Sequence, residues 1–139
     1  LATTPELAGP LNVVRMARPG KVNAPAQRAA LAALKGPQEC VRQMVHEYAR
    51  RREAIHRRLS EVVGLDYVTP DSAFYFFCRY HADMSSAQMV DYLYDKGVSV
   101  RSGTQFGSTG QGWFRLSYCV ALKDALDGID RLAAAMRLL

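Results

Sequence analysis

The sequence has few cysteines, one tryptophan and no long apolar run. Cys40, Cys78 and Cys119 lie far apart, form no Cys-x-x-Cys pair and have no histidine at the spacing of a zinc site. We therefore expect no metal, and reduced thiols packed as small hydrophobic side chains. No apolar run approaches the roughly 18 residues of a membrane span, and the first ten residues lack a basic segment followed by an apolar one. These absences predict a soluble, cytoplasmic protein with no membrane partner.

The chain has the length of one domain, because 139 residues can bury roughly two-thirds of the surface that is exposed on unfolding. Apolar residues make up 49% and charged residues 22%, which indicates neither disorder nor a coiled coil. The net charge of +5 is placed unevenly, since residues 1–69 hold 11 Lys and Arg against 6 Asp and Glu, whereas residues 70–139 hold 7 of each. Such asymmetry is typical of a nucleic-acid surface or of a pocket for anions. The first residue is leucine, so we expect a piece of a longer protein.

Helical patterns dominate the first half of the sequence. Residues 1–23 mix short apolar clusters with proline and glycine, and we expect an irregular lead-in there. The following alanine-rich stretch predicts a helix that begins near Pro25 and ends at Gly36. Apolar residues then repeat at intervals of three and four over residues 38–63, which predicts a long helix. Its other faces carry six arginines without interleaved aromatic residues, so we interpret them as a solvated face that binds no nucleic acid.

The second half alternates strand and helix patterns. The aromatic segment 73–78 predicts a strand. A helix is expected to begin at Ser85, which has a glutamine at capping-box spacing, and to end at Gly97. Residues 98–101 and 113–119 predict two more strands, and a last helix follows them. The order predicts an α/β chain of the α+β kind, in which helices cover a small antiparallel or mixed sheet.

An arginine, Arg115, lies in the middle of the apolar strand 113–119. Strand alternation places Phe114, Leu116 and Tyr118 on one face, and Arg115 on the other together with Trp113, Ser117 and Cys119. No carboxylate lies within seven residues of Arg115 on either side, and a buried guanidinium without a partner costs several kcal/mol. Its partner is therefore a distant Asp or Glu, water at the sheet edge, or an anionic ligand. The four glycines before the strand permit close approach of a ligand, and the guanidinium suits a bidentate carboxylate, which makes a carboxylate pocket as well supported as a structural role.

The segment GVSVRSGTQFGSTGQGWFRLSY resembles the C-terminal signature of class I/II aminotransferases, the fold-type I enzymes that use pyridoxal phosphate. In that family a strand, a Gly-x-x-Phe-Gly turn and an Arg-hydrophobic-Ser strand follow in this order. NAPAQRAALAAL, YARRREAIHRRL and TPDSAFYFF resemble, in turn, the lead into the interdomain helix, its Arg-Arg-acidic segment and the first strand of the small domain. The resemblance implies that residues 1–37 end the large cofactor-binding domain and that residues 38–139 form the connecting helix and the C-terminal small domain.

The resemblance also implies roles for single residues. Arg115 would bind the α-carboxylate of an amino acid or 2-oxo acid substrate and orient it on pyridoxal 5'-phosphate. Phe106 and Gly107 would shape the turn over the site. Tyr75 or Phe74 would line its apolar wall.

A further arginine is implied in substrate binding by the segment RPGKVNAP. This segment resembles the region in which aspartate-type members carry an arginine that crosses to the neighbouring subunit of the homodimer and binds the distal carboxylate. Arg18 has the matching spacing from Asn23. We favour the alternative, in which Arg15 and Arg18 are solvated loop charges.

The chain departs from the family pattern in one major respect. Aminotransfer needs a lysine that holds the cofactor as a Schiff base, and none of the four lysines has a matching position. The family places that lysine, the aspartate for the pyridine nitrogen and the phosphate-binding groups upstream of the first residue here. We therefore expect this chain to be inactive alone. Two smaller departures are Ser102-Gly103 where Pro-Gly is common, and Asp71-Ser72-Ala73 where a glycine often stands.

Two alternatives remain open on the sequence. The first is another fold-type I enzyme, a synthase or a decarboxylase-like enzyme, because the arginine clamp serves several reactions of amino acids. The second is a stand-alone interaction module that uses the basic helix over residues 38–63.

Overall fold

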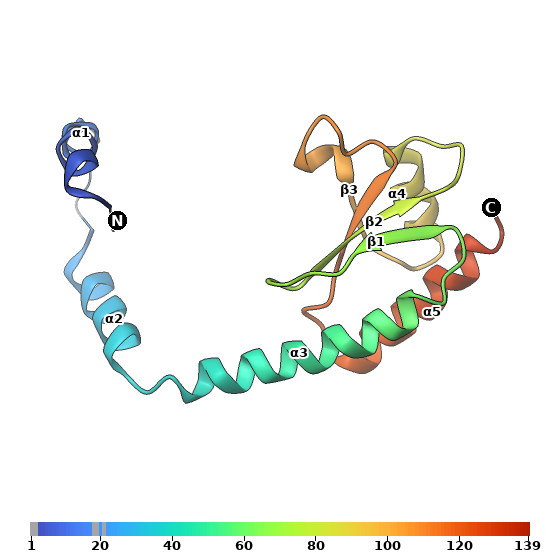
Figure 1. The fold of residues 1–139 in the computed structure, drawn as a ribbon, viewed down its shortest axis with the longest axis horizontal. Coiled ribbons are helices and arrows are strands. Elements are labelled where there is room, and N and C mark those ends of the chain that lie inside the picture. The colour runs from blue at the N-terminus through green and yellow to red at the C-terminus, as the bar shows by residue number, and fades with distance from the viewer. Residues whose placement is uncertain (1–2, 18–19, 21) are drawn as a thin grey trace. The chain divides into compact units, whose positions relative to one another are not determined.

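The computed structural model describes residues 3–17, 20 and 22–139. The chain divides into two compact units, with the boundary in the sequence between residues 39 and 40. The N-terminal unit contains two helices, and the C-terminal unit contains a sheet with helices packed on it (Figure 1). We describe each unit by itself. None of the described helices is long and apolar enough to cross a membrane.

The N-terminal unit begins with a helix where the sequence predicts an irregular lead-in over residues 1–23, and that prediction is wrong. Helix α1 (Pro5–Met16) has Pro5 in its first turn, where a missing N–H is tolerated. Pro10 lies inside the helix and removes one hydrogen bond. The surrounding leucine, alanine and methionine residues favour helix and continue it past that point.

The second helix, α2 (Ala24–Lys35), confirms the prediction made for the alanine-rich stretch. The Asn23 side chain accepts a hydrogen bond from the Ala26 N–H at 2.8 Å and so caps its start. The Gly36 N–H donates to the Ala32 carbonyl at 2.8 Å at its end. Neither α1 nor α2 has a buried residue among those described.

The C-terminal unit is a four-stranded antiparallel sheet of order β1-β2-β4-β3 with helices on one face. Figure 1 shows α3 and α5 side by side along the sheet, and an ion pair between Arg58 and Asp130 joins them (Nε to Oδ1, 2.7 Å). The elements in chain order are α3 (Glu39–Leu59), β1 (Leu65–Val68), β2 (Tyr75–Tyr80), α4 (Ser86–Asp95), β3 (Arg101–Ser102), a 3-10 helix (Gly103–Phe106), β4 (Trp113–Ser117) and α5 (Leu122–Met136). The predicted α+β fold is confirmed.

The core lies between the sheet and the three helices α3, α4 and α5. Phe114, Leu116 and Tyr118 are buried, which confirms the face predicted from strand alternation. The neighbouring strand β2 buries Phe76, Cys78 and Tyr80 by the same alternation. The helices contribute these buried residues: Ile55 and Leu59 from α3, Met89 and Leu93 from α4, and Ile129 and Leu132 from α5. One layer of helices therefore packs on one face of the sheet, and the opposite face carries Arg115.

The start of α4 has the predicted capping box. The Gln88 N–H donates to the Ser85 hydroxyl at 3.3 Å, and the Ser85 N–H donates to the Gln88 side-chain oxygen at 2.9 Å. After the helix ends, Gly97 adopts a left-handed backbone with φ of 77°.

The cysteines differ in burial, which corrects the expectation that all three are packed. Cys78 is fully buried, and burial raises the pKa of its thiol to about 12. Cys40 and Cys119 are exposed, and all three are free thiols. Only Cys78 therefore behaves as a small core side chain.

The turn before β2 is held in an unusual backbone conformation. Ala73 has φ of 60°, in the left-handed region, and β2 consequently begins at Tyr75, two residues later than the predicted strand. The Tyr118 hydroxyl donates to the Ala73 carbonyl at 3.0 Å, and the Tyr118 N–H donates to the Phe74 carbonyl at 3.0 Å. These two hydrogen bonds fix the turn, and the positive φ at Ala73 is a backbone conformation that glycine adopts more readily than alanine.

Replacing Ala73 by glycine should therefore stabilise the protein. Glycine adopts a positive φ without the steric penalty of a Cβ atom, so we expect the free energy of unfolding to rise by up to about 1 kcal/mol. Denaturant unfolding followed by circular dichroism measures the change. The control Ala134→Gly, on the exposed face of helix α5, should instead lower the stability by about 1 kcal/mol. If Ala73→Gly lowers the free energy of unfolding as much as the control does, the backbone at Ala73 is not strained.

Candidate functional site

The candidate site lies on the face of the sheet that the helices do not cover. Arg115 in β4 lies between two strands, opposite Phe77 of β2 on one side and opposite Arg101 of β3 on the other. Tyr75 and Trp113 share this face by alternation along their strands. The face that the helices cover is buried and apolar, so the charged side chain of Arg115 lies on the opposite face.

The Arg115 guanidinium is held by two aromatic rings. Its Cζ atom lies 4.0 Å from the centroid of the Tyr75 ring and 4.4 Å from the centroid of the Phe106 ring. Its Nε atom is buried and has no hydrogen-bond partner among the described residues. The ring contacts fix the plane of the guanidinium, and its N–H groups donate only within that plane. The two rings therefore orient the Arg115 guanidinium, and its Nε–H group has no hydrogen-bond acceptor among the described residues.

A pocket of about 210 Å³ opens beside this guanidinium. Two arginines and three hydroxyl side chains contribute to its wall, and the lining found among the described residues includes no carboxylate. The positive wall without a counter-charge favours an anion. The lining residues are Tyr75, Ser99, Val100, Arg101, Arg115 and Ser117.

The glycine loop before β4 places Phe106 against Arg115. Gly103 and Gly110 pack backbone against backbone, and a Cβ atom on Gly110 would overlap the Gly103 carbonyl group. The buried Ser86 hydroxyl, at the start of α4, accepts a hydrogen bond from the Gly112 N–H at 2.9 Å and donates to the Gly110 carbonyl at 3.3 Å. The loop is therefore closed on itself and anchored to a helix.

Substitution of Gly110 by alanine should open this loop. The new methyl group has no room beside the Gly103 backbone, so we expect the free energy of unfolding to fall by about 2 kcal/mol. Thermal or denaturant unfolding measures it. Gly128→Ala is the control, since that glycine lies in α5 with open space around its Cα atom, and it should raise the stability by about 1 kcal/mol. If both substitutions change the free energy of unfolding equally, the backbones of Gly103 and Gly110 do not pack as closely as described.

The residues proposed from the resemblance fall in different places. Tyr75 and Phe106 contact Arg115, and Gly107 follows the 3-10 helix with φ of 148° and open space at its Cα atom. Phe74, the alternative to Tyr75, stacks on Tyr48 at 5.6 Å between ring centroids and packs against the core. Arg18 lies outside the described residues.

Strand alternation places Ser117 on the same face as Arg115, whereas sequence reasoning missed Arg101 and Ser99 as neighbours of Arg115. Ser117 was found because it lies two residues after Arg115 on the same strand. Arg101 could not be found in this way, because its place opposite Arg115 depends on how the intervening loop turns.

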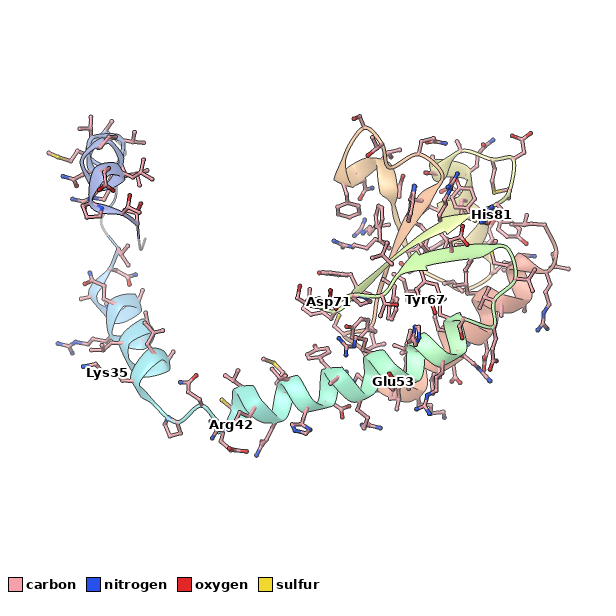
Figure 2. The ribbon with its side chains drawn as sticks, in the orientation of Figure 1. Lys35, Arg42, Glu53, Tyr67, Asp71 and His81 are labelled. Atoms are coloured by element: carbon pink, nitrogen blue, oxygen red, sulfur yellow. The ribbon has the colours of Figure 1, made fainter. Side chains whose placement is uncertain are left out.

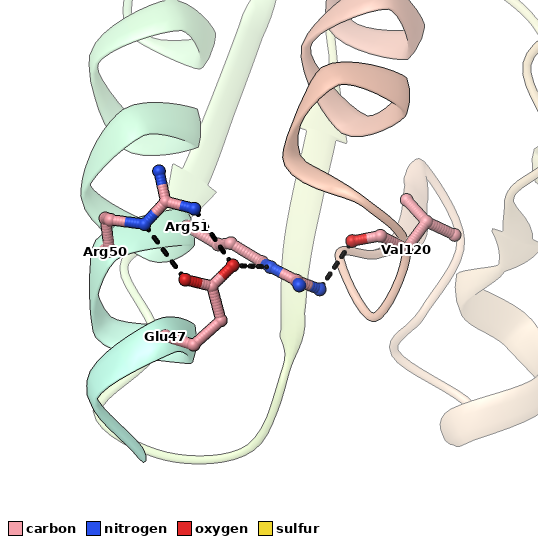
Figure 3. Close-up of polar contacts among 4 residues, drawn as sticks. All are labelled: Glu47, Arg50, Arg51 and Val120. Carbon is pink, nitrogen blue, oxygen red and sulfur yellow. Dashed lines mark hydrogen bonds and ion pairs between the residues drawn. The ribbon is translucent and has the colours of Figure 1, made fainter. Parts of the chain in front are cut away.

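The arginines of α3 are used within the fold. Figure 3 shows the Glu47 carboxylate accepting hydrogen bonds from Arg50 and Arg51, while Arg51 also donates to the Val120 carbonyl before α5. These donors lower the pKa of Glu47 from its ordinary 4.5 to about 2. The stabilisation from this carboxylate is therefore present above pH 4.5 and is lost as the pH falls toward 2. The arrangement ties α3 to the neighbouring elements.

Further contacts of α3 reach the sheet. Arg52 donates to the Pro70 carbonyl at 3.1 Å in the turn between β1 and β2. Tyr67 points from β1 toward α3 (Figure 2), where its hydroxyl lies 2.9 Å from the His56 Nδ1 atom. Helix α3 therefore supports the sheet through polar contacts as well as through its apolar face.

Comparison with known proteins decides the family. The family model for aminotransferase class I and II matches residues 11–132. The chain belongs to this family. The aminotransferase family that the sequence signature indicates is thereby confirmed.

Individual aminotransferases match over most of this chain. It is 35% identical over 115 residues to an aspartate aminotransferase of Pyrococcus abyssi, covering 80% of this chain and 29% of that protein. It is 35% identical over 108 residues to an LL-diaminopimelate aminotransferase of Dehalococcoides mccartyi, covering 77% and 28%. The chain thus spans less than a third of the length of these curated relatives.

Solved aminotransferase structures have the same fold. An alanine aminotransferase from Pyrococcus furiosus superposes with a TM-score of 0.78 at 30% identity, covering 84% of this chain and 30% of that one. A probable N-succinyldiaminopimelate aminotransferase from Thermus thermophilus superposes with a TM-score of 0.85 at 25% identity, covering 94% and 35%. Both α1 and α2 contribute to the second match, since it covers nearly the whole chain.

The described residues do not by themselves fit the cofactor of the family. Of the described lysines, Lys35 closes α2, Lys96 caps α4 and Lys123 opens α5, and none of them lines the pocket beside Arg115. No group of three or more His, Cys, Asp or Glu side chains gathers as a metal site within the part of the chain that the structure describes. The pocket beside Arg115 has two arginines and no carboxylate in its described lining, a charge distribution that favours an anionic group.

Proposed function

We propose that this chain is the C-terminal part of a pyridoxal-phosphate-dependent aminotransferase and that Arg115 binds the substrate α-carboxylate. The enzyme transfers an amino group between an amino acid and a 2-oxo acid. The single observation that carries the proposal is the Arg115 guanidinium, held by two rings with an unpaired buried Nε atom beside an anion pocket. Family membership and the aminotransferase relatives support the reaction class.

The geometry suits a carboxylate that must be oriented. A planar guanidinium donates two parallel hydrogen bonds to one carboxylate, which fixes the carboxylate plane as well as its position. Because the rings of Tyr75 and Phe106 hold the guanidinium, the Cα atom attached to that carboxylate is held in one place. The Arg115 Nε atom is buried from water, which strengthens an ion pair formed there. A bound carboxylate would satisfy the Nε–H group that lacks a partner among the described residues.

The rest of the catalytic centre belongs to the longer protein in this proposal. The cofactor, when bound there, supplies the electron sink that permits bond breaking at Cα. Residues 1–37 would end the large cofactor-binding domain, and residues 38–139 would form the connecting helix and the small domain. The active enzyme would be a homodimer, in which Phe106, Gly107 and Tyr75 shape the substrate site of each subunit. A distal-carboxylate role for Arg18 stays a prediction.

Substitution of Arg115 by glutamine in the whole enzyme tests its role. Loss of a desolvated charge partner costs at least about 2 kcal/mol of binding, so we expect kcat/KM to fall at least about 30-fold for every amino-acid substrate. Arg115→Lys should recover only part of the loss, because an ammonium group does not form the bidentate pair.

The matched control is Arg79→Gln, an exposed arginine on the same face of the sheet outside the pocket. It should leave kcat/KM within about 3-fold of the parent enzyme. The Arg115 variant should lose no more than about 2 kcal/mol of stability, because it gives up the two ring contacts but no hydrogen bond to the Nε atom. A strong loss of stability with kcat/KM preserved would show that Arg115 is structural.

The isolated chain should not form a lysine-bound cofactor. Because the described lysines lie at helix ends away from the pocket, mixing the chain with pyridoxal phosphate should give no stable absorbance band that borohydride traps. Mass spectrometry after borohydride treatment checks for an adduct. A single lysine modified in high yield would contradict the assignment of the Schiff-base lysine to an upstream segment.

A further inference from the structure

Ser86, the first residue of helix α4, is not among the residues that line the pocket beside Arg115. Its side chain is fully buried, with an exposed fraction of 0%. Burying a hydroxyl group is unfavourable unless hydrogen bonds replace those that it made to water. The hydrogen-bond partners of this hydroxyl therefore show which part of the structure the residue holds.

The Ser86 hydroxyl bridges two backbone groups of the glycine loop. It accepts a hydrogen bond from the Gly112 N–H at 2.9 Å and donates to the Gly110 carbonyl at 3.3 Å. The Tyr80 hydroxyl lies farther away, at 3.5 Å, and its shorter hydrogen bond is to the Met84 carbonyl at 2.9 Å. A single side chain of α4 thus holds the end of the loop where the chain returns to strand β4.

The loop itself buries little surface that could fix its position. Residues 104–109 are exposed, and only Gly103 and Gly110 on either side of them are buried. These two glycines pack backbone against backbone, because a Cβ atom added to Gly110 would overlap the Gly103 carbonyl group. The position of Gly110, which Ser86 holds, therefore sets the position of the 3-10 helix that begins at Gly103 and ends at Phe106.

The Phe106 ring stands at the end of this series of contacts. Its centroid lies 4.4 Å from the Arg115 Cζ atom, and the residue is 48% exposed. A second ring contact, with Phe77, is edge-to-face at 6.2 Å between centroids. Because about half of Phe106 faces water, the place of its ring depends on the loop backbone that carries it. The other ring on the guanidinium, that of Tyr75, belongs to strand β2 and does not depend on the loop.

We propose that Ser86 is a positioning residue for carboxylate binding: through the glycine loop it holds the Phe106 ring on the Arg115 guanidinium. The ring contact fixes the plane in which the guanidinium N–H groups donate. The inference rests on the proposed function, in which Arg115 binds the substrate α-carboxylate. Loss of the Ser86 hydroxyl changes the orientation of the guanidinium and leaves its charge unchanged.

The substitution Ser86→Ala in the 139-residue chain tests the inference without the cofactor. Alanine is a good helix former, so the change removes the two loop hydrogen bonds without weakening α4 itself. An aromatic ring shifts the NMR signal of a group stacked on it, and the Arg115 Nε–H signal therefore reports the position of the Phe106 ring. We expect Ser86→Ala to move this signal in the same direction as Phe106→Leu, which removes the ring.

Acetate binding, titrated at constant ionic strength, gives a second measurement. Ser86→Ala and Phe106→Leu should each weaken acetate binding about 5-fold, since each removes the same ring contact. The double variant should bind acetate within about 2-fold of Phe106→Leu alone, because two changes that act through one contact are not additive. Arg115→Gln should abolish acetate binding.

The neighbouring serine provides the matched control. Ser85 caps the same helix and accepts from the Gln88 N–H at 3.3 Å, but it makes no printed contact with the glycine loop. Ser85→Ala should therefore lower the denaturant midpoint of unfolding and leave the Arg115 signal unchanged. If Ser86→Ala does not fold, Ser86→Cys replaces it, because a thiol is a weaker donor and acceptor of similar size. Its effects should have the same direction and be smaller.

The outcomes separate this inference from the proposed function. If the Arg115 signal in the folded Ser86 variant stays at its parent position, the inference is overturned. The same holds if the losses of acetate affinity from Ser86→Ala and Phe106→Leu multiply in the double variant. If Arg115→Gln leaves acetate binding intact while Ser86→Ala still moves the Arg115 signal, the proposed function fails and the link between Ser86 and the guanidinium is supported.

Kinetics of the whole enzyme provide a further measurement. Ser86→Ala should lower kcat/KM about 5-fold for amino-acid substrates, whereas Ser85→Ala should leave it within about 2-fold of the parent enzyme. An equal loss of kcat/KM in the two variants would mean that Ser86 acts only through the stability of α4, and it would overturn the inference.

Discussion

The site depends on one constraint. One face of the sheet is buried under the helices, so the charged side chain of Arg115 must lie on the other face. Alternation along β4 commits Phe114 and Leu116 to the core, so the side chain between them must leave the sheet on the other face. There it finds the rings of Tyr75 and Phe106 and no carboxylate within the described lining of the pocket. The packing that stabilises the fold therefore also creates the unpaired positive charge that favours an anionic ligand.

The remaining structure holds this arrangement in place. The glycine loop closes on itself at Gly103 and Gly110, and the Ser86 hydroxyl anchors it to α4. On the other side of the sheet, α3 packs into the core and its arginines bind carbonyl and carboxylate groups of neighbouring segments (Figure 3). Several arginines of α3 are thus held by structural contacts, whereas Arg115 lies in a segment, residues 96–123, that contains no Asp or Glu.

Local signals predicted the parts of the fold that depend on neighbours in sequence. The capping box at Ser85, the helix after Asn23 and the buried face of β4 all involve residues within a few positions of each other, and all three are confirmed. The predictions were wrong where other parts of the structure outweighed a residue's usual local preference. Proline and glycine suggested an irregular start, yet α1 continues past Pro10, and the β2 strand starts later because two hydrogen bonds from Tyr118 hold the turn at Ala73.

The sequence by itself determined the family signature, the order of helices and strands after α1, and the fact that Arg115 has no acidic neighbour along the chain. These properties follow from residue type and spacing. Only the tertiary structure decided which groups surround that arginine. It placed Tyr75 rather than Phe74 on the guanidinium, left the Nε atom without a partner among the described residues, and set Arg101 opposite Arg115. Each depends on strand register and loop closure, which long-range hydrogen bonds and packing fix and which no local pattern encodes.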